Sequence, residues 1–195
     1  MSNESELDQM FEGSELQLLD QYVIQFNNDI RNAEFYFETL EQILSQEHDK
    51  EVLAYKEEAQ KLTQTQQNTI FEQSILPFWD EIFNYNLKSS FVISLFSILE
   101  VYLKNLCQVV GLAKNSEVRV KDFRGNFLDR TDNFLRVYIG RSINSLDWQT
   151  MRRIYKIRSI FTHNQGMCLQ HESELKQFIE ETDGINVNSG WIEIE

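Results

Sequence analysis

The sequence predicts a mainly α-helical protein that forms a single domain over residues 1–195 and ends in a small β-hairpin. The chain contains one proline and seven glycines. Because the turns of all-β domains depend on these two residue types, their scarcity favours long helices. The hydrophobic share of 42% is typical of globular proteins. A chain of 195 residues can bury a sizeable core.

The N-terminal half is predicted to hold an acidic tail at residues 1–13 and two helices. Apolar residues recur at helical spacings of three and four from about Ser14, namely Leu16, Leu19, Val23, Phe26 and Ile30. The polar segment 45–50 is expected to break this first helix. A second helix is expected from about Glu51 past Leu62. Pro77 should end or kink the helix that precedes it.

The most apolar helix is predicted from about Tyr85 to Val110, in a central and mostly buried position. Its polar residues form one narrow stripe at helical spacing, made of Ser90, Ser94, Ser97, Glu100, Lys104 and Gln108. Glu100 and Lys104 form an i,i+4 pair in the favourable order. Gly111 is expected to stop this helix.

The C-terminal part is predicted to contain three helices and the terminal hairpin. Gly125 and Asn126 signal a turn, and a helix follows over about residues 128–143. Asp147 is expected to cap the next helix, which should end within residues 163–166. A short helix is expected at residues 173–181. Residues 184–195 alternate with period two around an Asn-Ser-Gly turn, and this pattern predicts the β-hairpin.

Cysteine usage and the N-terminal residues favour the cytoplasm. Cys107 and Cys168 lie far apart and form no secreted-type disulfide framework, so both are expected to be buried or inert thiols. The acidic N-terminus lacks the basic start and apolar core of a secretory signal. Polar residues interrupt the longest apolar stretch, residues 91–103, and a membrane span needs ~20 apolar residues, so no membrane association is expected.

Charge is distributed unevenly along the chain. The net charge is −13, which by itself argues against a nucleic-acid partner. Residues 113–158, however, hold 11 Lys/Arg against 5 Asp/Glu, a net charge of +6 that leaves −19 for the remaining residues. Since salt screens charges beyond ~10 Å, this basic region can bind an anion on an acidic protein. A solvated basic face without a ligand explains the same charge equally well.

Common catalytic and metal-binding signals are absent from the sequence. No glycine-rich phosphate loop and no Gly-x-Ser-x-Gly elbow is present, so no cofactor is expected. His163, Cys168 and His171 do not follow known zinc spacings and lack an evident fourth ligand, so no metal site is predicted. His48 is expected to be solvated, and His171, which follows a loop, is expected to have no role.

One remaining constellation, Ile157-Arg158-Ser159-Ile-Phe-Thr-His163-Asn164, joins an arginine and a histidine at the end of an amphipathic helix. Histidine carries protons near neutral pH, and arginine binds phosphate oxygens in bidentate fashion. The pair therefore suits metal-free RNA cleavage. Structural roles remain open, because a cation near a helix C-terminus gains ~0.3–1 kcal/mol from the helix dipole and Arg158 could pair with Glu100.

The segment 154–166 resembles the Arg-x4-6-His signature of HEPN domains, and the helix around Glu100 is similar to the Glu-bearing helix of many members. The resemblance covers roughly residues 85–195 and includes the terminal hairpin. It implies a helical bundle that forms a homodimer and, in active members, a metal-independent endoribonuclease that is often a toxin or defence protein. Ser159 departs from the Asn, Asp or His that often follows the arginine.

By this resemblance, Arg158 would bind the scissile phosphate and His163 would act as general acid or base at a composite site between two subunits. Glu100 would orient Arg158, and Asn164 would be a supporting polar contact. Apart from the resemblance, Ser159 keeps a hydroxyl beside the arginine and is counted as a supporting residue, and the basic residues Arg152, Arg153 and Lys156 of the same helix are the predicted RNA-binding residues.

Three functions follow as alternatives. The first is a dimeric HEPN-type ribonuclease. The second is a non-catalytic HEPN module that binds RNA, a nucleotide or a cognate, antitoxin-like protein. The third is a helical protein-interaction domain in which Arg158 and His163 are structural.

Overall fold

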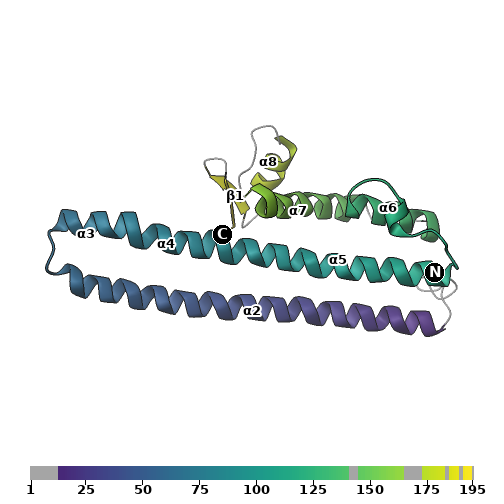
Figure 1. The fold of residues 1–195 in the computed structure, drawn as a ribbon, viewed down its shortest axis with the longest axis horizontal. Coiled ribbons are helices and arrows are strands. Elements are labelled where there is room, and N and C mark those ends of the chain that lie inside the picture. The colour runs from purple at the N-terminus through teal and green to yellow at the C-terminus, as the bar shows by residue number, and fades with distance from the viewer. Residues whose placement is uncertain (1–12, 141–144, 165–172, 183–184, 189–190, 195) are drawn as a thin grey trace. The chain divides into compact units, whose positions relative to one another are not determined.

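The computed structural model describes residues 13–140, 145–164, 173–182, 185–188 and 191–194, and these are mainly α-helical with a short antiparallel β-hairpin at the end (Figure 1). This confirms the predicted fold class. Of the predicted tail at residues 1–13, only Gly13 is described, and it begins the first helix. The elements are α2 (Gly13–Ala59), α3 (Gln64–Ile70), the π-helical turn η1 (Phe71–Ile75), α4 (Leu76–Asp80), the π-helical turn η2 (Glu81–Leu87), α5 (Lys88–Ala113), the 3₁₀ turn η3 (Val120–Asp122), α6 (Phe127–Ile139), α7 (Ser145–Asn164), α8 (Ser173–Glu180), β1 (Ile185–Asn188) and β2 (Trp191–Ile194).

Helix α2 continues through residues 45–50, so the predicted break there is wrong. This segment contains no glycine or proline, and its Lys50 and Glu47 form an i,i+3 ion pair. His48, which was expected to be solvated, is only 32% exposed and stacks edge-on against Trp79 at 5.4 Å. Apart from His48, the polar residues of this segment lie on the exposed side of one long helix and do not end it.

Pro77 does not end the helix. The helical form changes from π to α just before this residue. The wide π-helical turn η1 immediately precedes it, and Pro77 lies in the first turn of α4. A proline lacks the N–H of a regular helical turn and its ring crowds the preceding turn. The wider turn accommodates both effects, so the chain stays helical.

Helix α5 passes the predicted stop at Gly111 and ends two residues later, at Ala113. Asn115 has a positive φ of 48°, and its N–H donates to the carbonyl of Leu112 at 3.0 Å. The N–H of Ser116 donates to the carbonyl of Gly111 at 2.8 Å. These two bonds form a Schellman motif, in which asparagine replaces the usual glycine because it also tolerates the left-handed conformation.

The polar stripe predicted on α5 is exposed, except that Glu100 is half-buried. The expectation of a mostly buried helix is met only in part. Phe96, Leu103, Cys107, Val109 and Val110 are buried. Val101 and Leu112, by contrast, are more than half exposed.

Helix α6 begins after the predicted turn, where Gly125 has a positive φ of 107° and the Asn126 side chain caps the helix by accepting the Asp129 N–H at 3.0 Å. It ends at Ile139, before the predicted residue 143. Gly140 adopts a left-handed conformation at φ 75° and terminates the helix.

The chain divides into two compact units, residues 1–31 with 95–155 (unit 1) and residues 32–94 with 156–195 (unit 2). Helices α2, α5 and α7 each contribute to both units, and the single domain over residues 1–195 stays a prediction. The helical stretch from α3 to α5 runs back along α2 and is called the returning helix. Within each unit, α2 and the returning helix lie side by side (Figure 1).

Unit 1 has two hydrophobic clusters. Phe134 and Leu135 of α6 pack against Cys107 and Val110 of α5 in the first cluster. The second cluster contains Phe96, Leu103, Leu128 and Trp148. Helices α2 and α5 are also joined by a hydrogen bond that Tyr102 Oη donates to Asp29 Oδ2 at 2.7 Å.

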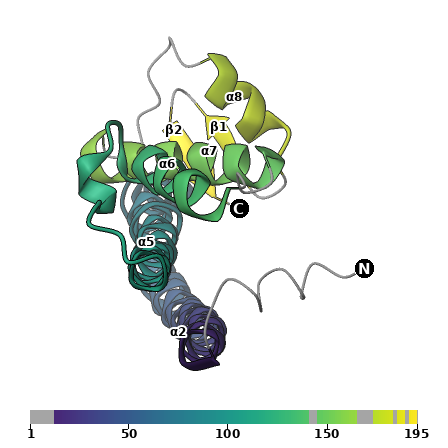
Figure 2. The ribbon, with the colours of Figure 1, turned by 90° about the vertical axis from the view of Figure 1, so that its right-hand side faces the viewer.

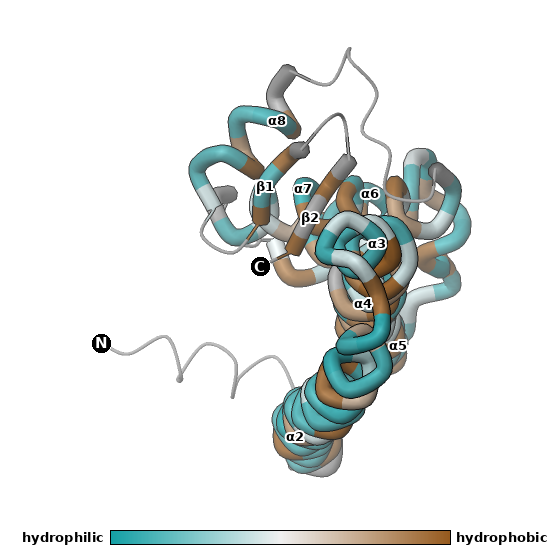
Figure 3. Tube along the Cα trace, turned by 90° about the vertical axis from the view of Figure 1, so that its left-hand side faces the viewer, coloured by the Kyte–Doolittle hydropathy of each residue, from teal (hydrophilic) through white to brown (hydrophobic). Residues whose placement is uncertain are grey.

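Unit 2 is built around α7, α8 and the hairpin, which lie together in Figure 2. The strands pair antiparallel with Ile185 opposite Ile194 and Val187 opposite Ile192, so these apolar residues share one face of the hairpin and pack into the core. Helix α8 alternates between hydrophilic and hydrophobic segments (Figure 3), and its Leu175 and Ile179 are buried. Lys88 Nζ donates to the Ile194 carbonyl at 2.6 Å, which fastens the hairpin to the start of α5.

We expect Leu128→Ala to lower the free energy of unfolding by about 2–5 kcal/mol, because Leu128 is fully buried and its truncation leaves a cavity. Val137→Ala on the same helix is the matched control. Val137 is 61% exposed, so its loss should change stability by less than about 0.5 kcal/mol. Urea unfolding followed by circular dichroism measures both. Equal effects of the two substitutions would contradict the assigned core.

Candidate functional site

The predicted Arg/His constellation lies on the last turns of α7, which begins at Ser145 and ends at Asn164. The predicted helix end is confirmed. The predicted capping role of Asp147 is wrong, because this residue lies inside the first turn. A carboxylate in that position still stabilises the helix through its dipole.

Arg158 is anchored beside the core of unit 2. Its neighbours Ile157 and Phe161 are 1% and 5% exposed. Arg158 itself is half-buried, and its Nε atom is fully buried. The hydroxyl of Thr162 donates to the Arg158 carbonyl at 2.8 Å, a local bond within the helix. The position and rotation of Arg158 are therefore set by the packing of α7.

His163 is exposed and lies in the last turn of α7. It follows Arg158 by five residues, which places the two side chains about 140° apart around the helix axis. Within one helix the two residues therefore point in different directions. A site that uses both needs groups from elsewhere, and a second copy of the chain is one source.

The three predicted RNA-binding residues of α7 have different environments. Arg152 is held in unit 1 by α6, with Nη2 at 3.1 Å from Asp129 Oδ1 and 3.5 Å from Asp132 Oδ2. Arg153 is half-buried. Lys156 is exposed in unit 2, on the part of α7 that carries His163. Of these three residues, Lys156 is the one that is exposed and forms no ion pair with a described residue.

The supporting residues are only partly brought together. Ser159 is half-buried on α7 between Lys156 and His163. Asn164 ends the helix, and its side chain lies outside the described atoms. Glu100 is half-buried on α5 in unit 1, so its orientation of Arg158 stays a prediction.

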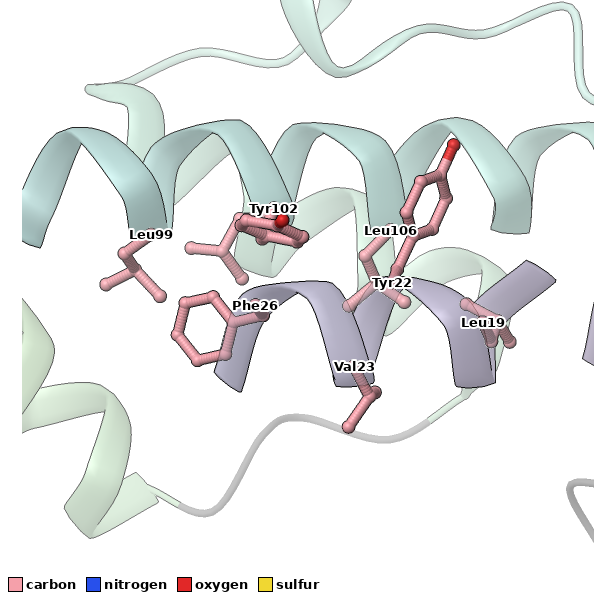
Figure 4. A pocket seen from close by; sticks show the side chains of 8 residues that line it. Leu19, Tyr22, Val23, Phe26, Leu99, Tyr102 and Leu106 are labelled. Atoms are coloured by element: carbon pink, nitrogen blue, oxygen red, sulfur yellow. The ribbon is translucent and has the colours of Figure 1, made fainter. Parts of the chain in front are cut away.

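Two apolar grooves were not predicted from the sequence. In unit 1, Leu99 and Leu106 of α5 point toward α2, and Phe26 of α2 also lines this space of about 200 Å³ (Figure 4). In unit 2, a groove of about 370 Å³ lies between α2 and the returning helix and includes Phe37 and Phe91, whose rings stack at 4.3 Å. Both join residues far apart in the sequence, so no local spacing could have indicated them.

Two side chains of unit 1, Tyr102 and Cys107, have raised pKa values. Burial, with the hydrogen bond to Asp29 and the charge of that carboxylate, raises the pKa of Tyr102 to about 12. Burial raises the pKa of the Cys107 thiol to about 12. Tyr102 therefore stays protonated as a donor to Asp29, and Cys107 stays a thiol. Among the described residues, no group of three His, Cys, Asp or Glu side chains could hold a metal ion.

No protein-family model matches this chain, and comparison with curated proteins and with solved structures gives no match either. Among the described residues, one helical stretch within Gln64–Ala113 has the length and apolar composition to cross a membrane. Core helices of soluble proteins meet the same criterion of length and composition.

We expect Cys107 to resist alkylation by iodoacetamide at pH 8 in the folded protein, because the reaction needs a thiolate and an accessible sulfur. The burial of Cys107, which is 2% exposed, removes both. A Cys168→Ser variant isolates the signal, and mass spectrometry counts the modified thiols. Urea should restore labelling, whereas rapid labelling of the folded variant would contradict the burial of this residue.

Proposed function

We propose that this chain is a HEPN-type, metal-independent endoribonuclease of the cytoplasm, with a toxin or defence role, that acts as a homodimer. The observation that carries the proposal is the position of His163, an exposed histidine at the end of a helix whose opposite side is fixed in the core. The motif Arg158-x4-His163 supplies the resemblance.

The local charge supports an RNA substrate. Residues 148–171 contain no Asp or Glu, although the chain has 31 acidic residues. The phosphate backbone of RNA dominates its binding to proteins, so a carboxylate-free stretch with several cations is a suitable contact. This region lowers the repulsion that the net charge of −13 would otherwise impose.

The chemistry needs proton transfer and charge stabilisation. A histidine would accept the proton of the ribose 2′-hydroxyl, whose oxygen attacks phosphorus to form a 2′,3′-cyclic phosphate. The bond to the 5′-oxygen breaks, and this oxygen receives a proton from an acid. Two copies of His163 would supply base and acid, and Arg158 would stabilise the phosphate charge.

We expect the purified protein to cut single-stranded RNA in EDTA and to leave cyclic phosphate ends. His163→Ala should lower the rate roughly 10²–10⁴-fold through the loss of acid–base catalysis. His171→Ala, for which no role is proposed, is the matched control. Circular dichroism verifies folding, and Arg158→Ala should also lose activity. An active His163→Ala protein, or cutting that requires metal, would contradict the proposal.

We expect a dimer in solution at micromolar concentration, because Arg158 and His163 of one helix diverge and a composite site needs a twofold interface. Light scattering coupled to size-exclusion chromatography measures the mass, which is 23.2 kDa for one chain. A monomer at this concentration would count decisively against a composite site.

The second candidate is a non-catalytic protein. It would be either a module that binds RNA, a nucleotide or an antitoxin-like protein, or a helical interaction domain. The exposed apolar residues of α2 favour an interaction role, with Phe35, Tyr36 and Ile24 at 71%, 65% and 61% exposure. A folded dimer that binds RNA without cutting it would favour this candidate.

A further inference from the structure

Lys156, Ser159 and His163 lie along one side of α7. Their spacing of i, i+3 and i+7 places them within about 60° of one another around the helix axis. Lys156 and His163 are exposed, and Ser159 is half-buried between them. The three residues define a polar stripe on the end of α7.

The core of unit 2 fixes the direction of this stripe. Ile157, Ile160 and Phe161 are 1%, 5% and 5% exposed and pack against α8 and the hairpin. The centre of this buried side is turned roughly 120° from the stripe. Rotating α7 to hide the stripe would expose these three apolar side chains, so the packing holds the stripe toward solvent.

The charges along the stripe suit an anionic ligand. No described residue forms an ion pair with Lys156, in contrast to Arg152, which Asp129 and Asp132 engage. No carboxylate occurs within residues 148–171. An ammonium group offers three donors to phosphate oxygens, and a serine hydroxyl offers one more.

We propose that Lys156, Ser159 and His163 form a phosphodiester-binding stripe, in which Lys156 holds the RNA phosphate next to the one where His163 transfers protons. This rests on the proposed function and adds a contact from the same subunit. Lys156 and His163 are separated by about 10 Å along the helix, which spans more than one nucleotide. Arg158 points about 160° away from Lys156, so the arginine cannot supply this contact from the same helix.

The test measures binding of a 2′-O-methyl RNA oligonucleotide, which cannot be cleaved, by fluorescence anisotropy across a salt series. We expect Lys156→Gln to weaken binding several-fold and to reduce the slope of log affinity against log salt by about 0.7, the value for one phosphate contact on a single strand. Lys156→Arg should retain most of the affinity. Lys61→Gln, at the exposed turn between α2 and α3 in the same unit, should bind like the wild type.

Cleavage of an unmodified RNA is measured in parallel, which separates the two proposals. Wild-type cleavage together with unchanged binding by Lys156→Gln would overturn the stripe and leave the ribonuclease standing. Lys156-dependent binding without any wild-type cleavage would overturn the ribonuclease and the proton transfer by His163, and would support the phosphate contact of Lys156. An equal loss of affinity in Lys61→Gln and Lys156→Gln would show diffuse electrostatic attraction and would overturn the stripe. A wild-type protein that does not bind RNA would also overturn it.

Discussion

The burial of Ile157, Ile160 and Phe161 fixes how α7 is rotated about its axis, and each candidate role on this helix depends on that rotation. These side chains pack against α8 and the apolar face of the hairpin, so the last elements of the chain orient the candidate site although none of their residues is assigned to it. The same packing half-buries Arg158 and exposes His163. A change in the hairpin would therefore act on the site through α7.

Electrostatics adds a second constraint. A chain with a net charge of −13 repels polyanions at long range, yet salt limits this repulsion to about a Debye length. The end of α7 lies within a sequence that has no carboxylate, while Arg152 is neutralised by two aspartates of α6. Local arrangement, rather than total charge, thus decides where an anion could approach.

The fold class, the terminal hairpin, the C-terminal end of α7 and the bounds of α8 could be predicted because they follow from local patterns. Period-two alternation, helical spacing and the turn residues Gly125 and Asn126 act over a few residues. The continuation of α2 through residues 45–50 could not be predicted, because a polar segment of a long helix resembles a loop in the sequence. The two are distinguished only when it is known which side of the helix packs against other elements. The stacking of His48 on Trp79 illustrates this, because the two residues are distant in sequence.

Local spacing is enough to place Arg158 and His163 on one amphipathic helix, at positions that point in different directions. Which of the two residues faces solvent depends on folding, because α8 and the strands contribute the apolar surfaces against which α7 packs. Folding likewise engaged Arg152 in an ion pair and left Lys156 exposed, although both are basic residues of α7. Spacing is a local property of the chain, whereas burial and pairing are made by residues that only folding brings together.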